Sequence, residues 1–93
     1  EEVFMSELVI SHLTTEHCFV VELEGRQARL DYQLNPDSVG HTGGQINFHH
    51  TYVPPEMRGQ GVAEKLVRAG LQWAKQEQFH ISASCWYVAK FLR

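Results

Sequence analysis

The sequence predicts a small α+β domain with a mostly antiparallel, twisted sheet, one long central helix and a short C-terminal helix. Three observations lead to this fold class. Several short segments in the first half alternate apolar and polar residues, as half-buried strands do. One long segment in the second half repeats apolar residues at intervals of three and four, as an amphipathic helix does. The chain has 93 residues, so we expect residues 1–93 to form a single domain.

The first half of the chain is predicted to form strands joined by turns. Residues 8–10 are apolar and predict a short edge strand. Residues 19–23 and 28–34 alternate apolar and polar side chains, and Glu24-Gly25 lies between them. A glycine-containing pair between two alternating runs predicts a β-hairpin.

A further strand is predicted over residues 45–53 and ends at Pro54-Pro55, because proline cannot donate to the strand ladder. Strict alternation gives this strand two faces. One face should carry Ile46, Phe48, His50 and Tyr52, and the other Asn47, His49, Thr51 and Val53. The preceding segment, Asn35 to Gly44, is rich in turn formers and should be an exposed loop, the local candidate for a lid.

The second half of the chain predicts the helices. The three-and-four periodicity runs from about Gln60 to Gln78 and predicts the long helix. Residues 81–85 alternate again and predict a short strand. Residues 86–93 are predicted to form the final helical piece. Its inward residues should be Val88, Phe91 and Leu92.

The composition excludes several classes of protein. Apolar runs are short, whereas a membrane-spanning helix needs about 20 apolar residues. The acidic start is unlike a secretory signal, and residues 1–4 are either a native extension or an added remnant. Cys18 and Cys85 lie far apart and match no disulfide or metal-binding pattern, and the six histidines are scattered. We therefore expect a cytoplasmic protein with free thiols and no metal site.

The charge is unevenly distributed along the chain. Residues 1–47 carry 8 acidic and 2 basic residues, whereas residues 48–93 carry 3 acidic and 6 basic ones. The second half therefore favours an anionic ligand. The pI of about 6.0 is well below the value of about 9 typical of nucleic-acid-binding domains. A small phosphorylated ligand fits this balance better than a nucleic acid or a membrane surface.

The junction between the last long strand and the helix, residues 53–63, is a candidate anion site. The first amides of a helix have no partner within the helix, and the helix dipole adds roughly half a positive charge there. Gly59 and Gly61 allow close approach to the backbone, and Arg58 adds a fork of donors. The spacing matches neither a Walker loop nor a dinucleotide fingerprint. The alternative is that the two glycines only shape the start of the helix.

These residues resemble a known signature. The run Arg58-Gly59-Gln60-Gly61-Val62-Ala63 is similar to the pyrophosphate loop of the GNAT acyltransferase superfamily. Together with residues 50–55, 64–67 and 85–88, it resembles the minimal GNAT-like N-acetyltransferase family of about 90 residues, over residues 17–93. The resemblance implies that acetyl-CoA, or coenzyme A, is the co-substrate and an unidentified amine the acceptor.

The resemblance also implies which residues hold the cofactor. The backbone at Tyr52 and Val53 would pair with the pantetheine arm. The pyrophosphate would be bound at residues 58–63, with Arg58 as the basic side chain and the others acting through their amides. Those residues are Gly59, Gln60, Gly61, Val62 and Ala63.

Three residues are candidates for catalysis, each with an alternative role. Cys85 follows a strand and begins a helix, where a thiol pKa can be lowered, but free cysteines are often buried as small apolar residues. The resemblance suggests that it lies near the thioester and can accept the acyl group. Tyr87 is either a general acid for the leaving thiolate or a packed ring. His50 is either a buried neutral imidazole or a general base in the thioester cleft.

The sequence leaves three functions open. The chain is an acetyl-CoA-dependent acyltransferase, a coenzyme A-binding module with little turnover, or a small interaction domain whose glycine turn binds nothing. It lacks the leading helices that build the acceptor groove in larger GNAT enzymes. A second copy of the chain, in a homodimer, is one candidate for completing that groove.

Overall fold

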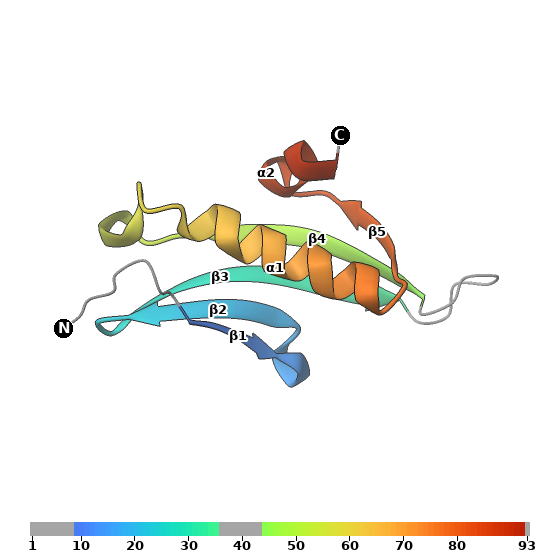
Figure 1. The fold of residues 1–93 in the computed structure, drawn as a ribbon, viewed down its shortest axis with the longest axis horizontal. Coiled ribbons are helices and arrows are strands. Elements are labelled where there is room, and N and C mark those ends of the chain that lie inside the picture. The colour runs from blue at the N-terminus through green and yellow to red at the C-terminus, as the bar shows by residue number, and fades with distance from the viewer. Residues whose placement is uncertain (1–8, 36–43, 93) are drawn as a thin grey trace.

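The computed structural model describes residues 9–35 and 44–92, shown in Figure 1. The elements are β1 (Ile10–Leu13), β2 (Cys18–Leu23), β3 (Arg26–Asn35), β4 (Gln45–Tyr52), α1 (Val62–Gln76), β5 (His80–Ala83) and α2 (Trp86–Ala89). The strands form one sheet in the order β1-β2-β3-β4-β5, antiparallel except for the parallel pair β4 and β5. Helix α1 lies across one face of this sheet. The predicted fold class is confirmed.

The hairpin between β2 and β3 forms at the predicted turn. Glu24 and Gly25 both have positive φ, 52° and 80°, as a type I′ turn requires. Strand β1 covers residues 10–13 rather than 8–10, and Leu8 lies outside the described residues. The predicted loop and lid also lie mostly outside the described residues, as do residues 1–4.

A β-bulge in β4 overturns the predicted facing of the second half of that strand. Tyr32 pairs with Phe48 and Asp31 pairs with His50, which leaves His49 as an extra residue. Such an insertion shifts the alternation by one position. The helix-covered face therefore carries Ile46, Phe48, Thr51 and Val53. His50 and Tyr52 lie on the other face.

The core lies between α1 and the sheet. The predicted helix is confirmed, although it begins at Val62 and ends at Gln76. Gly70 faces the sheet at a point of close contact, where a Cβ added to it would lie 2.8 Å from Leu30 Cδ2 and 3.0 Å from Phe48 Cε1. Both of these side chains are fully buried. The absence of a side chain at Gly70 therefore sets how closely the helix approaches the sheet.

The chain after β5 turns earlier than predicted. The amides of Ser84 and Cys85 both donate to the carbonyl of Phe48, at 3.1 and 3.2 Å, so the strand ends at Ala83 and Cys85 becomes the N-cap of α2. Val88 is buried and Phe91 packs against the core, as expected. Leu92 is 41% exposed, so its predicted inward position is wrong. The tighter 3-10 turn at residues 90–92 changes the helical spacing.

Replacing Gly70 by alanine should destabilise the protein although alanine is the better helix former. The added methyl group overpacks Leu30 and Phe48, which typically costs about 1 to 3 kcal/mol, against a propensity gain of about 1 kcal/mol. We expect a net loss of about 1 kcal/mol in the free energy of unfolding, measured by urea denaturation. Gln72→Ala, on the exposed side of α1, is the control and should change stability little. A more stable Gly70→Ala protein would contradict this account of the packing.

Candidate active site

The candidate site lies where β4 and β5 separate. The two strands pair only from Gln45↔His80 to Phe48↔Ala83. Beyond this point β5 gives way to α2, and the side of β4 away from β3 has no neighbouring strand at residues 50–52 among the described residues. Figure 1 shows the divergence of the two strands and the position of α2 beyond it. A free strand edge next to a gap offers backbone donors and acceptors to an extended ligand.

Two adjoining hollows follow this gap along the helix-covered face. The first, about 200 Å³, lies at the start of α1 and is lined by the glycine turn, including Gly59 and Gly61. The second, about 250 Å³, lies at Cys85. Both are lined by Val53, Arg58, Ala63 and Tyr87, so the two hollows adjoin each other. We refer to the two hollows together as the thiol cleft.

The glycine turn has the backbone shape that the sequence indicated. Gly59 and Gly61 have φ of 83° and 75°, and nothing lies within 4 Å of a Cβ placed on either. Gly61 is the N-cap of α1, so the first amides of the helix follow directly. This start of the helix borders the thiol cleft, where an anion can be bound by backbone N–H groups.

The charged residues of the junction are held by neighbouring groups. Arg58 donates from Nε to the carbonyl of Val53 at 3.0 Å, so its guanidinium lies along the strand edge between the two hollows. Glu56 forms an exposed ion pair with Arg26 at 3.1 Å, across the hairpin end of the sheet. Glu56 therefore ties the junction to β3.

Cys85 is a half-buried thiol with a polar environment. Its Sγ lies 3.5 Å from Oγ1 of Thr51, and the backbone amides of Val88, Tyr87 and Thr51 favour the thiolate form. Burial alone would raise the pKa of this thiol. The hydrogen bonds from Thr51 and from the amides outweigh burial and lower the pKa below its ordinary value. A lowered pKa increases the fraction of nucleophilic thiolate at neutral pH.

Tyr87 lies between the two hollows of the thiol cleft. Its ring packs against Trp86 and Phe91, and the ammonium of Lys90 lies 4.7 Å from the ring centroid. Burial, with a smaller contribution from the nearby Glu64 carboxylate, raises the pKa of its hydroxyl. The hydroxyl is therefore protonated at neutral pH, as a proton donor must be. Its ring packing and its place in the cleft are compatible with both predicted roles.

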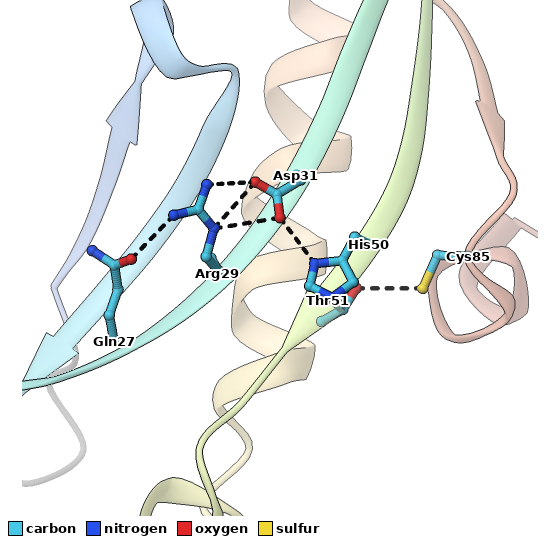
Figure 2. Close-up of polar contacts among 6 residues, drawn as sticks. All are labelled: Gln27, Arg29, Asp31, His50, Thr51 and Cys85. Atoms are coloured by element: carbon cyan, nitrogen blue, oxygen red, sulfur yellow. Dashed lines mark hydrogen bonds and ion pairs between the residues drawn. The ribbon is translucent and has the colours of Figure 1, made fainter.

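His50 does not face the thiol cleft, and both predicted environments, the core and the cleft, are wrong. The bulge at His49 turns it to the opposite face, where its side chain is 56% exposed. There Nδ1 lies 3.0 Å from Oδ2 of Asp31, whose other oxygen accepts from Arg29 at 2.7 Å. Figure 2 shows this cluster in front of the sheet and α1 behind it.

Sequence reasoning missed Thr51, Asp31 and Trp86 as residues around the site. Strict alternation places Thr51 on the wrong face, because the order of polar and apolar residues in β4 does not indicate that a bulge is present. Asp31 lies far from the thiol in sequence and becomes relevant only through its register with His50. Trp86 lines the second hollow and is 73% exposed, and its position directly after Cys85 was the available signal.

The described residues contain no group of three or more His, Cys, Asp or Glu side chains that could hold a metal ion. None of their helices is long and apolar enough to cross a membrane.

A mostly antiparallel sheet whose strands β4 and β5 separate next to a glycine-shaped helix start is compatible with the GNAT-like fold that the sequence motifs resemble. A family model described as GCN5-related N-acetyltransferase matches residues 18–93. The chain therefore belongs to the GCN5-related N-acetyltransferase family, as its sequence motifs indicated.

The chain is also similar to curated vertebrate proteins called Protein NATD1. The Bos taurus protein is 35% identical over 48 residues, which are 52% of this chain and 42% of that protein. The Gallus gallus and Homo sapiens proteins are each 33% identical over 48 residues, covering 44% and 42% of their lengths. The aligned part is thus less than half of these relatives.

The two cysteines should differ in their reaction with iodoacetamide. Cys85 has a lowered pKa and partial exposure, whereas Cys18 is fully buried and its pKa is raised by burial. We expect Cys85 to be alkylated first at pH 7, as mapped by peptide mass spectrometry. In Thr51→Val, the midpoint of the curve of Cys85 alkylation rate against pH should rise by about 0.5 to 1 pH unit. This shift corresponds to the loss of one hydrogen bond to the thiolate.

Thr14→Val, in the exposed turn after β1, is the matched control and should leave the midpoint unchanged. Equal alkylation rates at Cys18 and Cys85, or an unshifted midpoint in Thr51→Val, would contradict the hydrogen-bond account of the thiol.

Proposed function

We propose that the protein binds acetyl-CoA in the thiol cleft and transfers the acetyl group to an amine, with Cys85 carrying the group as a thioester between the two steps. The observation that carries this proposal is that the two hollows of the thiol cleft adjoin each other. One lies at the start of α1 and the other at a thiol whose pKa is lowered. Membership of the acetyltransferase family supports acyl-CoA as the ligand class.

Each part of the cleft would contact a different part of the cofactor. The amides after Gly59 and Gly61 would bind the pyrophosphate, and the basic Arg58 lies beside them. The outward-facing backbone groups of β4 near Val53 would pair with the amides of the pantetheine arm. The carbonyl of Val53 now accepts from Arg58, so the guanidinium would have to release it when the arm binds.

The chemistry at the other end is an exchange of thioesters. The Cys85 thiolate attacks the carbonyl carbon of acetyl-CoA, a new C–S bond forms, and the C–S bond to coenzyme A breaks. Tyr87 would give its proton to the departing coenzyme A thiolate, and its raised pKa keeps the hydroxyl protonated until then. The amine then attacks the acetyl-Cys85 carbonyl and releases the thiol. The reaction needs Cys85 reduced, which agrees with the expected cytoplasmic location.

Acetyl-CoA should raise the melting temperature of the protein. A ligand that binds only the native state at 100 times its Kd stabilises by about 2.7 kcal/mol, which moves the Tm of a small domain by roughly 10 °C or more. In Gly61→Glu this shift should disappear, because the carboxylate enters the anion site. Differential scanning fluorimetry with acetyl-CoA and coenzyme A measures both proteins.

Gly25→Glu is the matched control for this experiment. Gly25 and Gly61 have similar positive φ, and neither Cβ would meet another atom, so the backbone cost of about 1 to 2 kcal/mol is shared. Gly25 lies in the β2–β3 turn and does not line the cleft, so its variant should keep the full ligand shift. A full shift in folded Gly61→Glu would reject the glycine turn as the anion site.

Incubation with acetyl-CoA should add one acetyl group to the protein, and intact-mass spectrometry detects it. The adduct should be absent from Cys85→Ala, present in Cys18→Ala, and removed by hydroxylamine, which cleaves thioesters. A different outcome is that Cys85→Ala still releases coenzyme A at the wild-type rate when an amine is present. That result would mean that the acetyl group passes directly to the amine and not through Cys85. Binding without adduct or release would identify a coenzyme A-binding module instead.

A further inference from the structure

A histidine on the edge strand β1 lies inside a cluster of aromatic rings that is separate from the thiol cleft. His12 pairs directly with Phe19 on β2, and the two rings stack with their centroids 4.0 Å apart. Trp73, on α1, meets His12 in a T-shaped contact with centroids 4.5 Å apart. His12 thus joins the outermost described strand of the sheet, visible in Figure 1, to the helix that covers the sheet.

The His12 ring is also the hydrogen-bond partner of a buried hydroxyl. Its Nε2 lies 2.6 Å from the hydroxyl oxygen of Tyr32, a buried residue of β3. Burial raises the pKa of this hydroxyl, which is therefore protonated at neutral pH. A neutral imidazole accepts that proton at Nε2 when its own proton is on Nδ1. The neutral form of His12 thereby satisfies a hydroxyl that would cost free energy if it were buried without a partner.

A second histidine contacts the same tyrosine. His17 follows the turn of residues Thr14–Glu16 between β1 and β2, and its φ is 55°. Its ring stacks on Tyr32 with centroids 5.4 Å apart, and its carbonyl accepts from the Tyr32 amide at 3.0 Å. The two histidines therefore hold β1 and the turn that follows it against one buried ring.

The surroundings of His12 supply no charge that would balance a proton on its ring. Phe19 and Trp73 present uncharged rings, and Tyr32 presents a neutral hydroxyl. The carboxylate of the turn, Glu16, is exposed. Within residues 9–35 and 44–92, no ion pair joins His12 to a carboxylate. A proton on His12 would thus place an unbalanced charge among rings that are partly or fully shielded from water.

This environment favours the neutral ring. Burial lowers the pKa of His12, and repulsion from a protonated His17 lowers it further. In a detached β1, His12 would take its proton near the ordinary pKa of 6.5, and in the closed cluster only at lower pH. The cluster is therefore fully stabilised above pH 6.5 and loses stability as the pH falls from there toward the lower pKa of the closed form.

Strand β1 is the part of the sheet that this loss affects first. It has four residues, and β2 is its one neighbouring strand among the described residues. A short edge strand with few partners opens at a lower free-energy cost than the centre of a sheet.

We propose that His12 is an acid-sensitive latch: its neutral ring holds β1 and the following turn against α1, and protonation releases them from the rest of the sheet. Release uncovers the rings of Phe19 and Trp73 and the edge of β2. The thiol cleft shares no residue with this cluster, so the cleft stays in place when the latch opens.

Hydrogen–deuterium exchange, read by peptide mass spectrometry, tests the release. Between about pH 7.5 and about pH 5, histidines are the side chains that ordinarily titrate. After correction for intrinsic exchange rates, the protection of residues 10–21 should decrease at the lower pH, whereas that of α1 should be kept. His12→Gln should not show this decrease, because its amide does not titrate and can still bond to the Tyr32 hydroxyl. His49→Gln, on the exposed β4 bulge, is the matched control and should behave as the wild type.

Histidine NMR of the wild-type protein gives a second readout that needs no variant of His12. The ring resonances of His12 should titrate below pH 6.5, in the same pH range as the loss of protection in β1. In His17→Gln the midpoint should move to higher pH, because the repulsion between the two rings is removed.

Three results would overturn the latch. The first is a wild-type His12 that titrates at or above pH 6.5, as it would if Phe19 and Trp73 stabilised the imidazolium by cation–π contact. The second is equal protection of residues 10–21 at both pH values in the wild type. The third is a folded His12→Gln that loses protection at the lower pH as the wild type does. The first two need only the wild-type protein, so they decide the matter even if His12→Gln does not fold.

Discussion

The bulge at His49 is the local feature on which the whole site depends. Without it, strict alternation would place His50 on the α1 side and turn Thr51 away from Cys85. With it, Thr51 joins the helix-covered face, where its hydroxyl reaches the thiol, and His50 joins the open face beside Asp31. The single extra residue therefore places the adjacent side chains of His50 and Thr51 on opposite sides of the sheet.

The bulge acts together with the early end of β5. The carbonyl of Phe48 accepts from the amides of both Ser84 and Cys85, which ends the parallel pairing and begins α2. The next residues of β4 consequently have no strand partner on the side that faces the thiol, within the described part of the chain. At the opposite end of the cleft, positive φ at Gly61 lets α1 begin at Val62 with its free amides beside Val53. The early end of β5 and the positive φ of Gly61 thus form the two ends of the cleft, and the bulge turns the Thr51 side chain into it.

The sequence predicted the features that depend on periodicity and on glycine, and missed those that depend on register. The order of elements, the turn at Glu24-Gly25 and the glycine turn before α1 all follow from local patterns. The facing of His50 does not, because a bulge is set by the pairing of β4 with β3, about 20 residues away. The Asp31–His50 contact and the Thr51–Cys85 contact require that register, so no local pattern contains them.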